Sequence, residues 1–295
     1  MPGASLSDMT ASILLTGADG FTGHHFARAA TERGYRVIVL RSNLTDAGDV
    51  LSELAGTRFD YVVHLAAISA VTHENSEEIY RVNLFGTLNL LTAIGAAQAQ
   101  PAKILLVSSA NVYGNCLQSP IDETVCPDPV NHYAMSKLAM EKMAKSQAGE
   151  LPLLFVRPFN YTGVGHDQRF VIPKIVAHYA RGADVIELGN TEVEREFNDV
   201  RTVCSVYLDL LEGGEVGEIY NVCSGSAHSL NAIITLLNEL SGQEMQVEVN
   251  PAFLRSSELA RLSGNPAKLE ACIGAVQHTP LDQLLDWMLR AAKPE

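Results

Sequence analysis

The stretch SILLTGADGFTG, residues 12–23, decides the fold of this 295-residue chain. Its first five residues form an apolar run that predicts a buried strand, and a helix is expected to continue from the glycine turn to Arg33. Glycines in such a turn let the backbone approach a pyrophosphate, and the N-terminus of the following helix attracts its negative charge. The spacing of Gly17, Gly20 and Gly23 therefore predicts a dinucleotide site. The alternative is a plain turn between a strand and a helix.

Strands and helices alternate beyond this turn. Apolar runs predict strands at residues 35–40, 61–67, 103–107 and 153–156, with helices at residues 76–97 and 131–147 between them. This alternation is typical of an α/β fold with a doubly wound parallel (Rossmann) sheet. The dinucleotide-binding domain is expected to span residues 11–162 and about 197–224. A smaller, discontinuous α/β substrate domain is expected from about 163–196 and 225–295, with residues 1–10 disordered.

Composition limits the partners. The chain is 47% hydrophobic with a formal net charge of -13, which argues against a nucleic-acid groove or an anionic membrane surface. It contains neither an apolar run of about 18 residues nor a secretory leader, so we expect a cytoplasmic protein that does not bind membranes. The five cysteines form no CxxC pair and the nine histidines no metal-ligand spacing. We therefore expect neither disulfides nor a metal site.

Tyr133 and Lys137 lie four residues apart in the predicted helix 131–147, and so on one helix face. A tyrosine that transfers protons near neutral pH needs its pKa lowered by roughly 3 units, or about 4 kcal/mol. An ammonium at about 4 Å supplies roughly 4 kcal/mol at an effective dielectric near 20. The pair therefore suits acid-base catalysis. The alternative is a core tyrosine beside a solvated lysine.

The residues after the second strand bear on the choice of cofactor. An acidic residue there suits the ribose 2′-hydroxyl of NAD, whereas an arginine suits the 2′-phosphate of NADP. This chain has Arg41 and Asn43, and its next carboxylate is Asp46. We therefore expect NADP(H) as the preferred cofactor, with NAD(H) also usable. The alternative is that Arg41 is a solvated loop residue.

Several motifs together resemble one family. They are the three glycines at 17, 20 and 23, HLAA at 64–67, Asn83, SSANVYG at 108–114, and Tyr133 with Lys137. From Ala11 onward the chain resembles the extended short-chain dehydrogenase/reductases that act on nucleotide sugars. The resemblance implies that Ser109, Tyr133 and Lys137 form a catalytic triad. It also implies cofactor contacts from Gly17, Gly20, Phe21, Gly23, Arg41, Asn43, Leu44, Leu65, Ala66, Ala67, Asn83, Tyr133 and Lys137.

The same resemblance implies a GDP-sugar as the substrate. Its contacts would come from Asn160, Val171, Lys174, Arg195, Arg255 and Glu258. A guanidinium suits a diphosphate because it can bond two oxygens at once, and Arg195 is the candidate for this role. The alternative is a surface arginine among the acidic residues Glu192, Glu194 and Glu196.

The two residues after the triad serine narrow the reaction. Family dehydratases carry acidic residues there, whereas this chain has Ala110 and Asn111, which cannot transfer protons usefully. Hydride transfer at C4 of the sugar remains, either once in a reductase or twice in a 4-epimerase that keeps its NAD bound. A nucleotide-binding relative without catalysis is the third alternative. The resemblance also implies a homodimer, or a higher homo-oligomer, in which helices 76–97 and 131–148 form a four-helix bundle.

Overall fold

The computed structural model describes residues 10–69, 75–97, 99–147, 149–253 and 260–293. Residues 1–9 of the expected disordered segment lie outside this range, as do the substrate candidates Arg255 and Glu258. The chain divides into two compact units. The first contains the residues up to Ser108 with 131–156 and 207–219, and the second contains 109–130, 157–206 and the residues from Tyr220 onward. The domain boundaries expected from the sequence remain a prediction.

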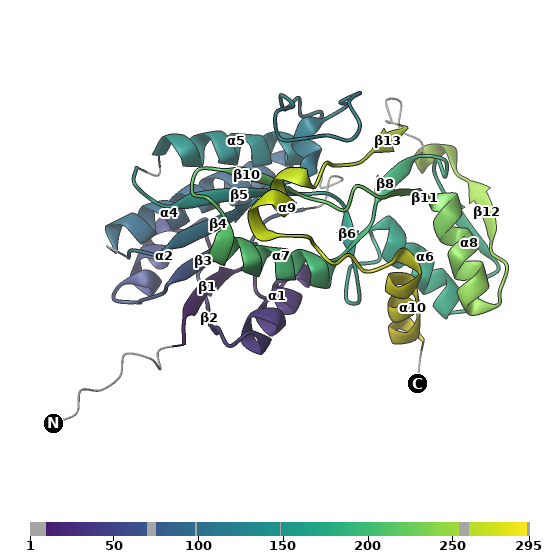
Figure 1. Ribbon diagram of the computed structural model, residues 1–295, viewed down its shortest axis with the longest axis horizontal. Helices are drawn as coiled ribbons and strands as arrows, with labels where there is room; N and C mark the ends of the chain where they lie inside the picture. Colours follow the sequence, from purple (N-terminus) through teal and green to yellow (C-terminus); the bar gives the residue numbers. More distant parts are fainter. Residues whose placement is uncertain (1–9, 70–74, 98, 148, 254–259, 294–295) are drawn as a thin grey trace. The chain divides into compact units, whose positions relative to one another are not determined.

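A six-stranded sheet in the order β10-β5-β4-β3-β1-β2 is built mainly from the first unit (Figure 1). Its strands are β1 (Ser12–Thr16), β2 (Arg36–Val39), β3 (Tyr61–His64), β4 (Lys103–Val107), β5 (Leu153–Pro158) and β10 (Ile219–Val222). The pairs β1–β2, β1–β3, β3–β4 and β4–β5 are all parallel. The chain winds from β1 to one edge and then, from β3, toward the other. The doubly wound parallel sheet expected from the alternation is thus confirmed.

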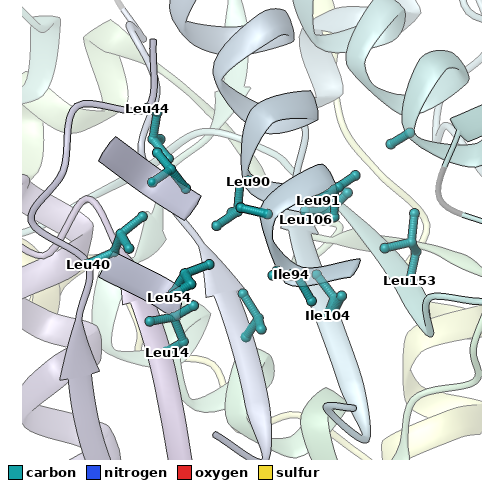
Figure 2. Packing of buried hydrophobic residues seen from close by; sticks show 14 of the residues in the cluster. Leu14, Leu40, Leu44, Leu54, Leu90, Leu91, Ile94, Ile104, Leu106 and Leu153 are labelled. Atoms are coloured by element: carbon teal, nitrogen blue, oxygen red, sulfur yellow. The ribbon is translucent and has the colours of Figure 1, made fainter. Parts of the chain in front are cut away.

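Helices cover both faces of this sheet. Their bounds are α1 (Phe21–Glu32), α2 (Ala47–Leu54), α3 (Ser76–Tyr80), α4 (Thr87–Ala96), α5 (His132–Gln147) and α7 (Val200–Gly213). On one face, α2, α4 and α5 bury a continuous apolar core against alternate residues of the strands (Figure 2). That core includes Leu14, Leu54, Leu90, Ile94, Ile104, Leu106, Met140 and Phe155. Figure 1 shows α1 on the opposite side of the sheet.

Two elements differ from the sequence-based expectation. The expected strand at 61–67 ends at His64, because the Ala66 amide then donates to the Thr16 hydroxyl at 3.2 Å instead of continuing the ladder. The expected single helix at 76–97 is interrupted by a π-helical segment, η1 (Arg81–Gly86). At its end, Gly86 packs closely on the loop after β2, since an added Cβ would lie 3.1 Å from the Leu44 Cβ.

The second unit combines small sheets with three longer helices. Strands β8 (Glu194–Glu196), β11 (Ala227–Ser229) and β13 (Arg261–Leu262) form one sheet with β8 in the middle. The other pairs are β7 (Val185–Leu188) with β12 (Gln246–Val249), and β6 (Tyr161–Thr162) with β9 (Asn198–Asp199). An apolar core lies among α6 (Val171–Ala180), α8 (Leu230–Ser241) and α10 (Leu281–Ala292). Short helices are η2 (Ala110–Tyr113), η3 (Pro251–Phe253) and α9 (Ala267–Ile273).

Three further observations concern partners. Of the helices in the described ranges, none combines the length and hydrophobicity that a membrane crossing requires. The same residues contain no group of three or more His, Cys, Asp or Glu side chains placed to hold a metal ion. All five cysteines are free thiols.

Candidate active site

The glycine turn after β1 is packed so tightly that two of its positions exclude a side chain. Gly17 has φ +70°, and an added Cβ would lie 2.6 Å from the Ala66 amide nitrogen. A Cβ on Gly23 would lie 2.0 Å from the Gly17 carbonyl oxygen. Helix α1 begins at Phe21, and no side chain of the described residues caps its N-terminus. The N-terminal end of a helix carries partial positive charge, so the start of α1 suits an anionic ligand such as a pyrophosphate.

The loop after β2 is held by a carboxylate that sequence reasoning missed. Glu53 on α2 accepts hydrogen bonds from the amides of Arg41 at 2.9 Å and Ser42 at 2.7 Å, and from the Ser42 hydroxyl. Burial would raise the pKa of Glu53, but these bonds outweigh it and lower that pKa. Arg41 itself is exposed. Arg41 is thus an exposed residue on a loop whose backbone is held by Glu53.

Two other cofactor candidates of this loop contribute internal contacts. The Asn43 amide oxygen accepts from the amide of Thr45 at 3.0 Å and from its hydroxyl at 2.9 Å, closing a turn. The Leu44 side chain is buried in the core, and its carbonyl accepts from the Asn89 amide at 2.9 Å. The Leu44 side chain is therefore part of the core, and its carbonyl is engaged within the protein.

His64 at the end of β3 is a buried neutral link. Its Nε2 lies 2.8 Å from the Thr87 hydroxyl, which donates its own proton to the Asn83 carbonyl. Nε2 therefore carries a proton, and Nδ1 accepts from the Thr16 hydroxyl at 2.7 Å. Burial, with a smaller effect from the Lys137 charge, lowers the pKa of His64 to about 3. Both ring nitrogens of His64 are thus engaged within the protein.

The Asn83 side chain continues this chain of hydrogen bonds. Its amide oxygen accepts from the Ile68 amide at 2.8 Å, and its amide nitrogen donates to the Ile68 carbonyl at 3.0 Å. The same nitrogen donates to the Ser136 hydroxyl at 3.0 Å, which in turn donates to the Tyr133 carbonyl. Hydrogen bonds thus connect the glycine turn, the segment after β3 and the helix that carries Tyr133. Asn83 fixes this backbone through an amide that is fully engaged within the protein.

Lys137 occupies a buried position on α5. Its ammonium donates to the Val107 carbonyl at the end of β4, at 2.8 Å, and only 4% of the residue is exposed. Burial lowers the pKa of Lys137 to about 8, while the charge of Glu141 acts in the opposite direction. Tyr133, one turn earlier, is 9% exposed. The structure therefore places both residues on one buried face of α5 and leaves a cation there at neutral pH.

Ser109 begins the second unit, two residues after the Val107 carbonyl that binds Lys137. It caps the short helix η2, and its hydroxyl oxygen accepts from the Asn111 amide and from the Asn111 side chain, both at 3.1 Å. The far end of η2 is anchored because the Tyr113 hydroxyl donates to Asn221 at 2.7 Å and the Arg157 guanidinium lies over the Tyr113 ring. The serine is therefore held rigidly within its unit.

The substrate candidates in the described part of the second unit occupy different elements. Asn160 is exposed, and its carbonyl accepts from the Asn198 amide at 2.9 Å. Val171 opens α6, and the Lys174 ammonium donates to the Glu187 carbonyl at 2.8 Å and lies over the Phe253 ring. Arg195 lies on the central strand β8 and donates to the Glu194 carbonyl at 2.8 Å.

Glu196 is the residue whose role was least visible in the sequence. It is 1% exposed, and its two carboxylate oxygens accept from the amides of Ser224 and Gly264, both at 2.7 Å. The hydroxyls of Ser224 and Ser263 and the Asn198 amide complete the set. Glu194 is instead paired with Arg261 at 3.0 Å. These carboxylates are therefore engaged elsewhere, so the acidic sequence around Arg195 is not by itself a reason to exclude an anionic ligand.

Comparison with known proteins identifies the family. Residues 13–223 match the family described as "NAD dependent epimerase/dehydratase family". The chain belongs to this family. It is 35% identical to the GDP-6-deoxy-D-mannose reductase of Pseudomonas aeruginosa, over 96% of this chain and 99% of that protein. It is 34% identical to the GDP-6-deoxy-D-talose 4-dehydrogenase of Aggregatibacter actinomycetemcomitans, over 89% of this chain and 91% of that protein.

A solved structure of the same family agrees with the fold. The structure of RMD from Pseudomonas aeruginosa, complexed with NADPH, superimposes with a TM-score of 0.89 at 32% identity. The match covers 97% of this chain and 98% of that one. The family resemblance drawn from the glycine turn and the Tyr133–Lys137 pair is thereby confirmed.

Proposed function

We propose that this protein is a nucleotide-sugar 4-ketoreductase that uses NADPH to reduce GDP-4-dehydro-6-deoxy-D-mannose to GDP-D-rhamnose. The observation that carries the proposal is the buried Lys137 ammonium on the Val107 carbonyl, one helical turn after Tyr133. It supplies the charge that makes a tyrosine an effective acid near neutral pH. The 35% identical relative named GDP-6-deoxy-D-mannose reductase supports the choice of substrate.

The first unit has residues that fit a dinucleotide. Gly17, where a Cβ would meet the Ala66 amide, keeps the turn tight, and the N-terminal end of α1 attracts the negative charge of a pyrophosphate. The exposed guanidinium of Arg41 suits a 2′-phosphate, so we propose NADP(H) as the preferred cofactor and NAD(H) as a poorer one. The relative bound to NADPH supports this preference. When bound, the reduced nicotinamide supplies the hydride that adds to C4 of the sugar.

The remaining steps belong to side chains of this chain. The Tyr133 hydroxyl gives its proton to the C4 oxygen as the carbonyl becomes an alcohol, and Lys137 stabilises the phenolate that remains. The Ser109 hydroxyl donates a hydrogen bond to the same C4 oxygen and stabilises its developing negative charge. One hydride and one proton thus reach the C4 carbonyl, and no other proton carrier is required. Ala110 and Asn111 offer none.

Binding of the GDP-sugar is assigned to the second unit. We propose that Arg195 bonds the diphosphate and that Asn160, Val171 and Lys174 contact the rest of the ligand, together with Arg255 and Glu258. Glu194 forms an ion pair with Arg261, and Glu196 accepts a hydrogen bond from the Ser224 amide. Because these two acidic neighbours have other partners, they support the role of Arg195. The net charge of -13 makes such local cations important for holding an anionic substrate.

GDP-6-deoxy-D-talose is the second candidate product. The reaction that forms it differs only in the face of C4 to which hydride is added. The relative named GDP-6-deoxy-D-talose 4-dehydrogenase, at 34% identity, favours this product. A 4-epimerase with tightly bound NAD is distinguished by consuming no cofactor.

The test mixes the purified protein with GDP-4-dehydro-6-deoxymannose and NADPH, and follows absorbance at the nicotinamide band. We expect oxidation of one NADPH per sugar, and NMR of the product distinguishes the rhamno from the talo configuration. Tyr133→Phe should lower kcat by about 1,000-fold or more and leave NADPH binding nearly unchanged, because only the proton donor is lost. No oxidation by the wild-type protein would refute the proposed function. Near-normal turnover of Tyr133→Phe would remove this tyrosine from the mechanism.

We further propose that the chain forms a homodimer or a higher homo-oligomer through its helices α3, η1, α4 and α5. Large apolar side chains are exposed on these elements, with Phe85 56%, Met135 44% and Met143 37% exposed. Such residues are typical of a helical interface. Light scattering tests this, since a dimer has twice the chain mass of 31.9 kDa. A cytoplasmic location is part of the same proposal, supported by the five free thiols.

A further inference from the structure

We propose that Asn111 is a positioning residue that makes the Ser109 hydroxyl a pure hydrogen-bond donor toward the C4 oxygen of the sugar. The inference rests on the proposed function, in which Ser109 contacts that oxygen. The inference gives Asn111 a role in hydride transfer. Family dehydratases carry acidic residues in this segment, directly after the triad hydroxyl residue.

The geometry that carries the inference lies within five residues. Ser109 has extended backbone angles, φ -161° and ψ 146°, and caps η2. Its hydroxyl oxygen accepts from the Asn111 backbone amide and from the Asn111 side-chain nitrogen, both at 3.1 Å. A hydroxyl has one proton to donate and two lone pairs to accept with. Asn111 therefore fills both acceptor positions and leaves only the proton.

The proton of Ser109 has no acceptor among the described residues of the chain. Only 5% of Ser109 is exposed, so packing fixes its position as well as Asn111 does. A ketone oxygen can only accept hydrogen bonds, and the alkoxide that develops from it accepts them more strongly. A serine whose lone pairs are already occupied matches that requirement. Two donors on the hydroxyl oxygen also polarise its O–H bond, which strengthens donation to the substrate.

The turn that holds this arrangement is itself fixed. The Gly114 amide donates to the Asn111 carbonyl at 3.1 Å, and Gly114 has φ +60°. A Cβ on Gly114 would lie 1.7 Å from the Asp128 carbonyl oxygen, so only glycine fits where η2 ends. Together with the Tyr113–Asn221 hydrogen bond, this keeps Asn111 in place before substrate arrives. The donor direction is therefore preorganised.

The test compares Asn111→Asp, Asn111→Ala, Ser109→Ala and the double variant Ser109→Ala/Asn111→Asp in the reductase assay. The introduced carboxylate has the shape of the amide but accepts the serine proton, which takes that proton away from the substrate. We expect Ser109→Ala to lower kcat by about 100-fold. Asn111→Asp should approach this loss, whereas Asn111→Ala should lower kcat by about tenfold, the size of one lost neutral hydrogen bond. The double variant should be no worse than Ser109→Ala, and the KM for NADPH should stay within about twofold in every variant.

The order of the two Asn111 variants decides the matter. A residue that only fills space would tolerate the isosteric aspartate better than alanine, so Asn111→Asp more active than Asn111→Ala would overturn the inference. The same result would arise if the amide oxygen accepted the serine proton, because aspartate preserves that contact. Additive losses in the double variant would also overturn it. Asn115→Asp, an equal change of charge at an exposed site in the same segment, is the control and should keep wild-type kcat. If the wild-type protein itself does not oxidise NADPH, the proposed function fails and not the positioning of Ser109.

Discussion

Replacing His64 with glutamine should make the protein less sensitive to acid. In the folded state the ring is buried between Thr16 and Thr87, and its pKa is lowered to about 3. An unfolded histidine titrates near 6.5, so between these values the unfolded chain binds the proton and the folded protein does not. Stability from this residue is therefore fully present above pH 6.5 and is lost as pH falls toward 3. At pH 5 the free energy of unfolding is lower by about 2 kcal/mol than above pH 6.5. As long as the folded ring stays neutral, this loss depends only on the pKa of histidine in the unfolded chain.

Urea unfolding at pH 7.5 and pH 5 measures this effect. Glutamine keeps one donor and one acceptor but cannot be protonated, so His64→Gln should cost about 1–3 kcal/mol at pH 7.5 through poorer packing and hydrogen bonding. On moving to pH 5, the gap to the wild-type protein should close by about 2 kcal/mol. His24→Gln, at an exposed position on α1, is the control and should follow the wild type. Parallel pH dependences for wild type and His64→Gln would refute the buried neutral histidine.

Three further outcomes are expected from the site. Glu196→Gln should lower the free energy of unfolding, measured in urea, by about 2–4 kcal/mol, because the new NH₂ group faces donors that the carboxylate satisfied. Glu248→Gln, on an exposed stretch of β12, is the control and should have no effect. Equal stability of Glu196→Gln and the wild-type protein would contradict the role of Glu196. Arg41→Ser should raise the KM for NADPH about tenfold or more and leave that for NADH nearly unchanged, because a charge-assisted contact to the 2′-phosphate is lost. Equal changes for both cofactors would exclude Arg41 as the determinant. Gly17→Ala should abolish binding of either cofactor in a titration, since its Cβ would meet the Ala66 amide at 2.6 Å; retained binding would show that the turn can move.

Much of this fold could be predicted from short stretches of the sequence. The strand, glycine turn and helix at residues 12–33 were predictable because the apolar run, the turn and the helix all lie within one short stretch. The Tyr133–Lys137 pair was predictable because helical spacing alone places two such residues on one face. The same local logic gave α5 nearly to the residue.

Long-range contacts explain what the sequence did not reveal. Glu196 bonds Ser263 and Gly264, 67 and 68 residues away, and in the sequence it stands among other acidic residues that suggest a solvated face. Glu53 lies on α2, 11 residues after Ser42, and its carboxylate bonds the loop after β2. The residues of the loop itself therefore gave no sign of this carboxylate. The π-helical segment at Arg81–Gly86 has no distinct periodicity in the sequence, because it interrupts an otherwise continuous helical pattern.

The hydrogen bonds through His64 also show why motif residues need not touch a ligand. Thr16, His64, Thr87 and Asn83 form one connected set that ends at the Tyr133 carbonyl through Ser136. In the sequence, Thr16, His64 and Asn83 belong to separate motifs. In the first unit they fix the backbone of the glycine turn and the catalytic helix with respect to each other.

Transfer of a labelled hydride tests the central claim most directly. The protein is mixed with GDP-4-dehydro-6-deoxymannose and NADPH that carries deuterium at the transferable nicotinamide position, and the product is analysed by mass spectrometry and NMR. A 4-ketoreductase places one deuterium on C4 of each sugar and oxidises one NADPH for each product molecule. Product without deuterium, or turnover without cofactor consumption, would contradict the account.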